Sequence, residues 1–504
     1  MTAQAVEEDL AVVIGLEVHV QLETDTKVFC GCSTDRAEAP NTNTCPVCLG
    51  LPGALPVLNE GAVEAAVRVG KAIDATIPEE TRFHRKNYYY PDLPKNFQIT
   101  QYDAPICRDG SLEIEVAGER RVVDIRRAHL EEDPGSLAHV TEGSRPLESR
   151  RTSIDRADYT LVDYNRAGTP LLEIVTEPDF RGPSEVRAFL AKLEEVLEYL
   201  GVFDAERDGS LRVDANLSVV GGETVADDGS VPRAVLEDAN RTEVKNISSH
   251  RGAEQALAYE ASRQRNAVER GREVAQETRH WDEAKGVTVS MRAKEAEKDY
   301  RYFQEADLPP LRVADWTERL SIPELPDARR ERFREEYDLS TEAAAKLTSR
   351  KQVADFYEAV AERFDPDTAA SWVADRLLGE LNYREMAVAD IEDRLEEFTR
   401  LIELVDGEEI SVKNAEETVL RTMLDEGLDP DAVVERESLG KTDDDAVVEA
   451  VETAIVENPD AVEDYRAGED GAINYLVGQV MSATGGSADP GTVNELLRER
   501  LEAD

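Results

Sequence analysis

Apolar and polar residues alternate in the segment at residues 13–22, strictly from residue 16 onward, and throughout residues 211–219. This period of two predicts strands that turn one face to a core and the other to a polar environment. In the first strand, Glu17, His19 and Gln21 occupy the polar face. The corresponding residues of the second strand are Arg212, Asp214, Asn216 and Ser218.

Helical periodicity begins at residue 183, where apolar residues recur every three to four positions up to residue 200. Prolines between residues 309 and 326 predict a linker, and the pattern after them is helical. We therefore predict an α+β protein of more than one domain. The predicted domains are residues 1–315 with the strands, residues 316–428 with helices only, and a small α-helical tail at residues 429–504.

The chain has 504 residues and a net charge of −49, from 107 acidic and 58 basic residues. Such charge makes a compact protein repel itself in dilute buffer, whereas molar salt screens the repulsion. The composition therefore predicts a protein of a halophile. A nucleic-acid partner normally needs a basic surface, so composition alone argues against one.

No run of 18 apolar residues and no signal-peptide pattern occur, which predicts a cytoplasmic protein without membrane association.

Four of the five cysteines form two close pairs, Cys30 with Cys32 and Cys45 with Cys48. This spacing favours a structural zinc knuckle, with a redox pair or unrelated buried thiols as alternatives.

The polar strand faces also have two interpretations. They are ordinary solvated faces of an antiparallel sheet, or they gather carboxylates and an imidazole around divalent cations. Their residues are rich in Glu, His, Asp and Asn, which favours the second interpretation. Such a set suits an ATP site with two or more metal ions, and a P-loop is excluded because no Walker-type sequence is present.

Residues 82–105 combine Lys-Asn pairs with several aromatic residues and two prolines. Their pattern suits neither a strand nor a helix, and we predict an ordered surface that presents cations, amides and rings. Such groups suit phosphates and bases, and an ordinary polar loop is the alternative.

The sequence RKNYYYPDLPKNFQITQY in this segment resembles a signature of the B subunits of aspartyl/glutamyl-tRNA amidotransferases. Further signatures recur in order along nearly the whole chain: GLEVHVQL, CPVCLGLPGALPVLN, HLEED, LVDYNRAGTPLLEIVTEPD, LRVDANLSV, EVKN, ETRHWD, DYRYF and NYLVGQVMSATGG.

The resemblance implies a first domain similar to glutamine synthetase, with ATP and Mg²⁺ in a carboxylate-lined cradle, and a YqeY-like tail that contacts tRNA. The implied Mg²⁺ ligands are Glu17, His19, Glu132 and Glu173, with Glu131 as a less certain fifth. The phosphate or acceptor side is implied at Lys86, Asn87, Asp214, Asn216, Glu243, Lys245 and Arg301. Lys86 and Arg301 join Glu17, His19, Glu132 and Glu173 as implied catalytic residues.

The implied reaction is that of a carbon–nitrogen ligase with glutamine as amido donor. ATP phosphorylates the side-chain carboxylate of Asp or Glu misacylated onto tRNA, and ammonia then displaces phosphate. The implied partners are a glutaminase A subunit and a C subunit, in a heterotrimer, with misacylated tRNA and no DNA. Cys107, the remaining cysteine, lies in no pattern of an activated thiolate. The alternatives are the related E subunit, which serves Glu-tRNA alone, and a non-catalytic tRNA-binding scaffold.

Overall fold

Contacts divide the chain into two compact units, residues Met1–Pro326 and Asp327–Asp504, which are described separately here. A computed structural model describes residues 10–35, 37, 39–140, 157–205, 207, 209–226, 230–293, 300–440, 444–466, 471–484, 488 and 490–502. The predicted boundaries at residues 315 and 428 stay predictions.

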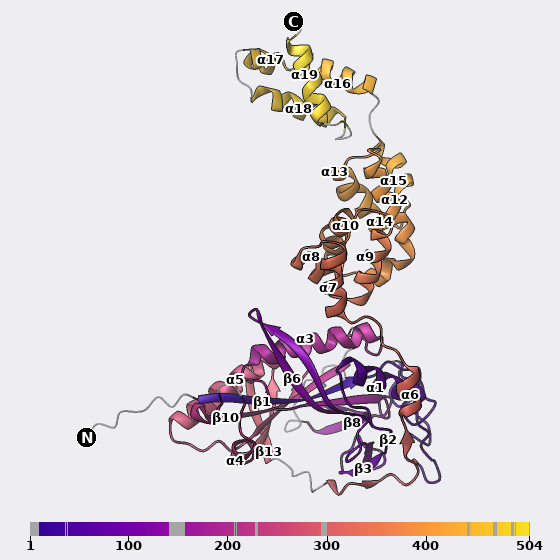
Figure 1. Ribbon diagram of the computed structural model, residues 1–504. Helices are drawn as coiled ribbons and strands as arrows, with labels where there is room; N and C mark the ends of the chain where they lie inside the picture. The colour runs from indigo at the N-terminus through magenta and orange to yellow at the C-terminus, as the bar shows by residue number, and fades with distance from the viewer. Residues whose placement is uncertain are drawn as a thin grey trace, which may run out of the picture. The chain divides into compact units, whose positions relative to one another are not determined.

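A single large sheet organises the first unit (Figure 1). Within the described residues it has eight strands, and neighbours are antiparallel except for one parallel pair, β11 with β12. The order across the sheet is β13 (Val287–Ala293), β12 (Glu277–Asp282), β11 (Thr242–Ile247), β10 (Leu211–Gly221), β1 (Leu10–Gln21), β9 (Pro170–Thr176), β6 (Glu119–Glu132) and β5 (Cys107–Val116).

Three helices pack against one face of this sheet: α1 (Glu60–Ala72), α3 (Pro183–Leu200) and α5 (His250–Glu269). The predicted helix at residues 183–200 is confirmed to the residue. Pro183 fits the first turn, where no backbone donor is needed, and Gly201 ends the helix in the left-handed conformation at φ 64°. The alternating apolar residues of β1 and β10 face these helices and are buried, so the polar residues occupy the opposite face.

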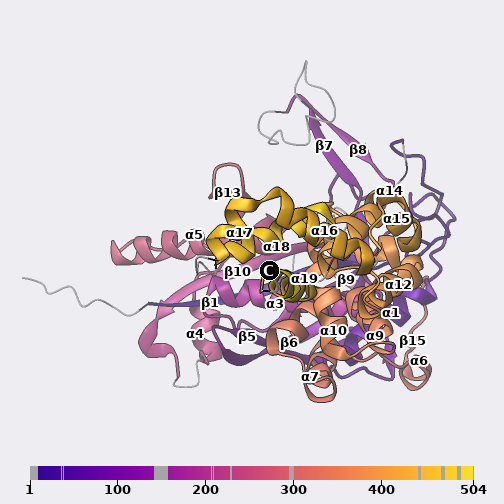
Figure 2. The same cartoon turned by 90° about the horizontal axis from the view of Figure 1, so that it is seen from above.

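Residues 82–105 contain two strands, so the prediction of a segment without strands was wrong. Strands β3 (His84–Asn87) and β4 (Phe97–Thr100) pair with each other, and β14 (Phe303–Gln304) pairs with β3. Each strand has four residues or fewer, which is too short for a period of two to stand out. The remaining strand pairs are β2 (Glu80–Thr81) with β15 (Leu311–Arg312), and β7 (Ser136–Val140) with β8 (Tyr159–Asp163), which Figure 2 shows as a projecting pair.

The described part of the second unit is helical, as predicted. Two separate apolar cores hold it together, one between Phe333 and Met423 with Val433, and one between Val447 and Leu501. The main helices of the first core are α7 (Pro326–Glu336), α9 (Lys351–Ala361), α12 (Leu395–Asp406) and α15 (Pro430–Glu437). The second core is formed by α16 (Asp444–Glu457), α18 (Ala472–Ala483) and α19 (Pro490–Glu502), with α17 (Pro459–Arg466) against it. None of the helices in the described ranges is long and apolar enough to cross a membrane.

Candidate active site

The strand register aligns the polar side chains of four central strands into rows. One row runs from His129 on β6 through Glu173 on β9 and His19 on β1 to Arg212 on β10. Directly paired residues point to the same face of a sheet, so this row lies opposite the helices. The alternation seen in the sequence therefore becomes one continuous polar surface across the sheet.

His19, Glu131 and Glu173 form a compact cluster on this surface. His19 Nε2 lies 3.5 Å from Glu173 Oε2 and 3.7 Å from Glu131 Oε1. Ligand atoms of the three side chains lie within 4.8 Å of one another, and both carboxylates are buried. The donor set is one nitrogen and two carboxylates, which suits a divalent cation.

The carboxylates of the site are compensated unequally: burial would raise the pKa of Glu173, but His129, His19 and Lys86 hold it well below its usual value, whereas the pKa values of Glu131 and Glu17 are raised. Burial, together with the charge of Glu173, raises the pKa of Glu131 to about 7. Burial would lower the pKa of His19, but the hydrogen bond and charge of Glu173, with Glu131, raise it to about 9. Burial also raises the pKa of Glu17, and Glu173 adds to that effect. A bound cation would relieve this repulsion, so the residues present fit a metal ion.

Glu17 belongs to a neighbouring polar group on β1, β10 and β11. The amide of Asn216 donates to Glu17 Oε1 at 3.1 Å. Lys245 Nζ contacts Asp214 and lies 3.3 Å from Glu243 Oε1. The structure therefore brings these five predicted site residues together beside the His19 cluster, with Asp214 paired directly to Glu17.

Glu132 lies outside the cluster, although it follows Glu131 directly. Lys95 Nζ lies 2.5 Å from Glu132 Oε2, and the backbone N–H of Ile99 donates to Oε1 at 2.8 Å. Successive residues of a strand point to opposite faces, so only one of the two glutamates can join His19. The geometry favours Glu131 as the metal ligand.

The segment just before β14 lies beside the end of β3. This region holds three predicted site residues: Lys86, Asn87 and Arg301. Lys86 Nζ lies 5.0 Å from the ring centre of Tyr300. The amide of Asn87 donates to the backbone oxygen of Arg301 at 2.9 Å, and Arg301 has φ 47°. Tyr302 stacks on Tyr102 with ring centres 4.2 Å apart. Tyrosine rings and the ammonium of Lys86 thus lie together beside β3, as predicted from residues 82–105.

Sequence reasoning missed three charged or ionisable residues of the surface: Arg127, His129 and Arg212. His129 Nε2 lies 3.5 Å from Glu173 Oε2, and burial lowers its pKa to about 4. Arg212 Nη2 lies 2.7 Å from Asp133 Oδ1. Alternation backward from Glu131 would have placed Arg127 and His129 on the same face, and Arg212 was assigned to the polar face without a role.

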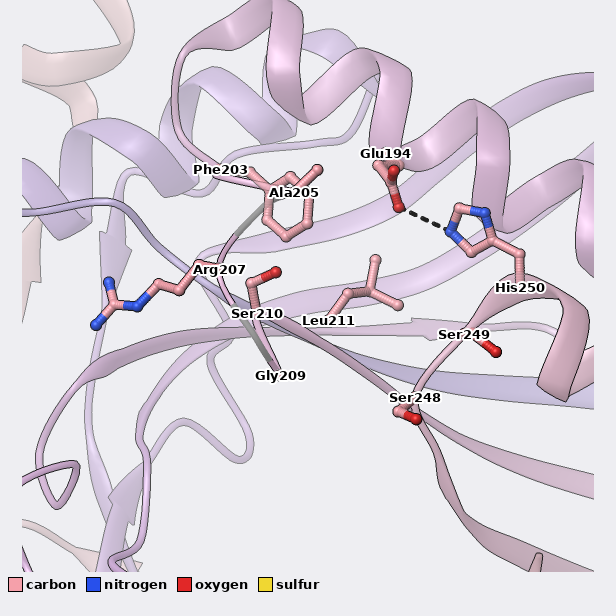
Figure 3. Close-up of a pocket in the computed structure, with 10 residues that line it drawn as sticks. All are labelled: Glu194, Phe203, Ala205, Arg207, Gly209, Ser210, Leu211, Ser248, Ser249 and His250. Carbon is pink, nitrogen blue, oxygen red and sulfur yellow. Dashed lines mark ion pairs between the residues drawn. The ribbon is translucent and has the colours of Figure 1, made fainter. Parts of the chain in front are cut away.

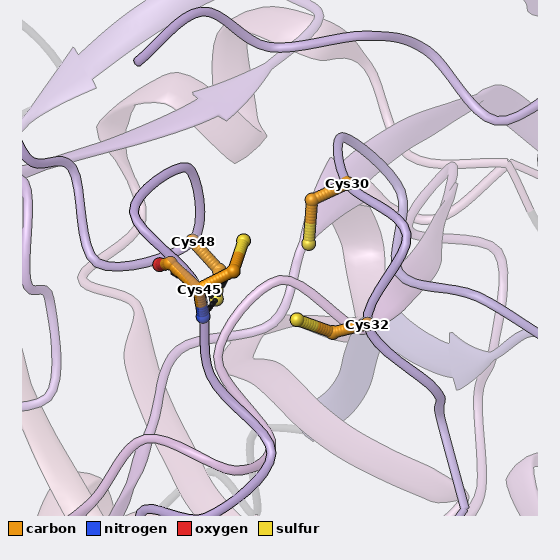
Figure 4. Close-up of side chains that lie close together, drawn as sticks. All are labelled: Cys30, Cys32, Cys45 and Cys48. Atoms are coloured by element: carbon orange, nitrogen blue, oxygen red, sulfur yellow. Dashed lines mark hydrogen bonds between the residues drawn. The ribbon is translucent and has the colours of Figure 1, made fainter. Parts of the chain in front are cut away.

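The four cysteines of the predicted knuckle lie together (Figure 4), and their sulfur atoms are within 4.8 Å of one another. All four are free thiols, and the backbone N–H of Cys45 donates to Cys48 Sγ at 3.1 Å. A hydrogen bond from Cys30 lowers the pKa of Cys48 to about 5. This group could hold a metal ion. Cys107 lies apart, and burial raises its pKa to about 12.

A cavity of about 330 Å³ lies away from both groups, between α3 and the start of α5 (Figure 3). Glu194 and His250 form an ion pair of 2.8 Å at its wall. A second cavity, of about 110 Å³, is lined by Glu17, Val175 and Asn216. The second cavity therefore opens beside the polar surface of the sheet.

Comparisons with known proteins show the family of the chain. Residues 12–318 match the family described as GatB/GatE catalytic domain, and residues 355–501 match the GatB domain. The chain is 75% identical over 505 residues to the B subunit of aspartyl/glutamyl-tRNA(Asn/Gln) amidotransferase from Haloarcula marismortui, with 100% of both chains covered. It is 74% identical to the protein of the same name from Natronomonas pharaonis, again over 100% of both chains. Identity to the Methanococcoides burtonii protein is 50%, over 98% of each chain.

Proposed function

Because the chain belongs to the GatB family of amidotransferase subunits, we propose that it is the B subunit of an aspartyl/glutamyl-tRNA amidotransferase. In this reaction the side-chain carboxylate of Asp or Glu, misacylated onto tRNA, takes the γ-phosphoryl group of ATP, and ADP leaves. Ammonia then attacks the acyl carbon, phosphate leaves with the electron pair of the C–O bond, and a proton is lost from nitrogen. The product is the amide on tRNA.

The observation that carries this proposal is the buried cluster of His19, Glu131 and Glu173. Mg²⁺ held there would supply positive charge to the phosphoryl oxygens and align the nucleotide. Glu17 borders the cluster and is held by Asn216, so it is the fourth candidate ligand. Glu132 acts in this proposal through its ion pair with Lys95, which fixes β4 against β6.

The cations around the cluster have the complementary task of binding the anionic reactants. Lys86 interacts with the carboxylates: burial would lower its pKa, but Tyr302, Glu131 and Glu173 raise it above the usual value for lysine. Lys245, held between Asp214 and Glu243, offers a second cation on the β11 side. Asn87 and Arg301 shape the chain beside Lys86. Together these residues suit a phosphate and an acceptor carboxylate that approach from the polar face.

The proposed partners are those that membership of the family implies. Ammonia comes from a glutaminase A subunit, a C subunit completes the complex, and misacylated tRNA is the substrate. The four cysteines bind zinc in a structural role, since four thiolates fill a tetrahedral site and leave no open position. The tail at residues 429–504 contacts tRNA.

The test is Glu173→Gln in the complete complex, which removes a charged ligand and keeps the shape of the side chain. ADP release that depends on misacylated tRNA should fall at least ~100-fold, with glutamine or with ammonium as donor. Glutamine hydrolysis by the partner should continue. Glu115→Gln, on an exposed position of β5, is the matched control and should retain activity. Amide formation by Glu173→Gln at the wild-type rate would contradict the proposal.

The same assay separates the alternatives. Complexes that bind tRNA but never release ADP would indicate a scaffold without catalysis. Use of Glu-tRNA alone would resemble the E subunit, whose catalytic domain belongs to the same family description. Both misacylated tRNAs therefore need to be assayed.

A further inference from the structure

Arg127 has an unusual environment for a partly buried guanidinium. Within the described part of the chain its side chain forms no hydrogen bond or ion pair, and its Nε atom is buried without an acceptor. The preceding residue, Arg126, is held by Glu177 through two bonds of 2.7 Å. Arg212, on the same sheet, is paired with Asp133. Arg127 therefore keeps its donors available.

The strand register places Arg127 on the polar surface. Arg127 pairs with Val175 on β9, Val175 pairs with Glu17 on β1, and Glu17 pairs with Asp214 on β10. This row lies next to the row that holds Glu173 and His19. Val175 is the one apolar member, and with Glu17 it lines the 110 Å³ cavity, which therefore borders the middle of the row.

Electrostatic effects place Arg127 close to two groups of the site. Its charge, with that of Lys86, contributes to lowering the pKa of His129 after burial, which is the larger cause. Both cations also oppose the effect of burial on Tyr302, whose pKa is raised to about 12. Arg127 and Lys86 thus flank the same part of the surface from β6 and β3.

The neighbour of Arg127 on its other side is also an arginine. Arg108 on β5 pairs directly with Arg127, and its side chain is exposed. Like charges directly opposite each other are unfavourable in a sheet, and the buried Nε of Arg127, which has no acceptor, costs further free energy. An anionic ligand that accepts from Arg127 would remove both costs.

We infer that Arg127 binds an oxyanion of the reactants, either phosphoryl oxygens of the nucleotide or the side-chain carboxylate of the substrate. This inference rests on the proposed function and adds a catalytic residue to it. A guanidinium presents two parallel donors that match either group, whereas an ammonium does not. Arg127 would stabilise the negative charge of that oxyanion during phosphoryl transfer.

The experiment compares Arg127→Met, Arg127→Lys and the unsubstituted chain in the complete complex, with ammonium as donor. Amide formation should fall at least ~100-fold in Arg127→Met, and Arg127→Lys should recover only part of it. The melting temperature of Arg127→Met should equal or exceed that of the wild type, because no protein partner is lost. Arg120→Met is the matched control, since Arg120 is exposed on the same strand and pairs with Glu113.

Two measurements distinguish the sources of the oxyanion. Weaker binding of Mg-ATP without tRNA identifies nucleotide phosphate as the ligand. Unchanged Mg-ATP binding with a raised KM for misacylated tRNA identifies the substrate carboxylate. Arg127→Met with wild-type amidation, or with a loss that parallels a lowered melting temperature, would overturn the inference. If the wild-type complex itself releases no ADP, the proposed function fails instead.

Discussion

The ammonium of Lys95 and the carboxylate of Glu132 form an ion pair of 2.5 Å, and both side chains are nearly buried. The second carboxylate oxygen of Glu132 accepts from the backbone of Ile99. Glu131, one residue earlier, lies beside His19 and Glu173 instead, and burial with the charge of Glu173 outweighs the opposing effects of His19 and Lys86 on its pKa. The two adjacent glutamates thus have different electrostatic environments: a close lysine pairs with Glu132, whereas the charge of Glu131 is compensated only in part.

Substitution by glutamine should therefore affect the two positions differently. Glu132→Gln leaves Lys95 without its counter-ion and should lower the free energy of unfolding by about 2 kcal/mol. Glu131→Gln removes a buried charge that is compensated only in part and repels Glu173, so the metal-free protein should be equally or more stable. The same change should abolish any stabilisation by Mg²⁺. Thermal unfolding of the purified chain, in EDTA and in Mg²⁺, measures both effects.

The pH dependence gives a control for this prediction. The pKa of Glu131 is raised to about 7 from 4.5, so its stabilising contribution is complete below pH 4.5 and is lost as pH rises through 7. In EDTA the wild type should therefore lose stability across this window, and Glu131→Gln should lose less. Equal pH profiles for the two proteins would contradict the assignment of Glu131.

Much of this arrangement followed from residue patterns. Period-two alternation placed Glu17, His19, Asp214 and Asn216 on one face, because a strand has only two faces. Alternation shows that Glu131 and Glu132 point to opposite faces of β6. It does not show which of these faces carries His19, so it could not choose between the two glutamates. Two features of the structure distinguish them. One is the register of β6 with β9, and the other is Lys95, which comes from a loop distant in the sequence and pairs with Glu132.

Long-range pairing also explains what the sequence did not predict. Strand β3 is only four residues long, and it pairs with β14, which lies more than 200 residues later. Such pairing is determined by tertiary contacts rather than by local periodicity. Arg127 was missed for a related reason. It stands out because its guanidinium has no hydrogen-bond acceptor or counter-ion within the described residues, and such contacts are known only from the three-dimensional structure.

Cys48→Ser should remove one of four thiolate ligands and release zinc, with a loss of stability, because structural zinc binding is coupled to folding. Metal analysis should give about one zinc per wild-type chain and much less in the variant. Cys107→Ser is the control, since Cys107 lies outside the cluster and its sulfur contacts the Ala66 carbonyl at 3.5 Å. Wild-type protein purified without chelators and free of zinc would refute the site.

Lys27 gives a finer test of the same cluster. Its side chain is fully buried, and Nζ lies 3.9 Å from Cys48 Sγ and donates to the Asn43 carbonyl at 2.8 Å. The ammonium offsets the negative charge that four thiolates bring to a metal. Lys27→Met should therefore keep the ligands but lose zinc to a competing chelator at about tenfold lower chelator concentration.

Removing residues 441–504 should leave a folded chain that has lost affinity for tRNA. No buried residue of the first helical core lies beyond Val433, and the second core lies entirely between Val447 and Leu501. The truncated chain should keep the thermal transition of the sheet domain and its binding of Mg-ATP. We expect the KM for misacylated tRNA to rise at least ~10-fold, which corresponds to the loss of about 1.4 kcal/mol of binding free energy. An unchanged KM would exclude residues 441–504 as a tRNA contact.

The response to salt should differ from that of an ordinary tRNA-binding protein. A basic protein loses affinity for tRNA steadily as salt rises, because each phosphate contact releases counterions. This chain carries a net charge of −49, and residues 401–504 contain 28 acidic and only 7 basic residues. At low salt the protein should therefore repel both itself and tRNA.

At about 1 M KCl the screening length falls to about 3 Å, so folding should improve first and tRNA binding next. Circular dichroism and complex formation, followed in parallel against KCl concentration, separate the two steps. Affinity that falls monotonically from low salt, in protein that stays folded throughout, would show that the acidic surface does not govern binding.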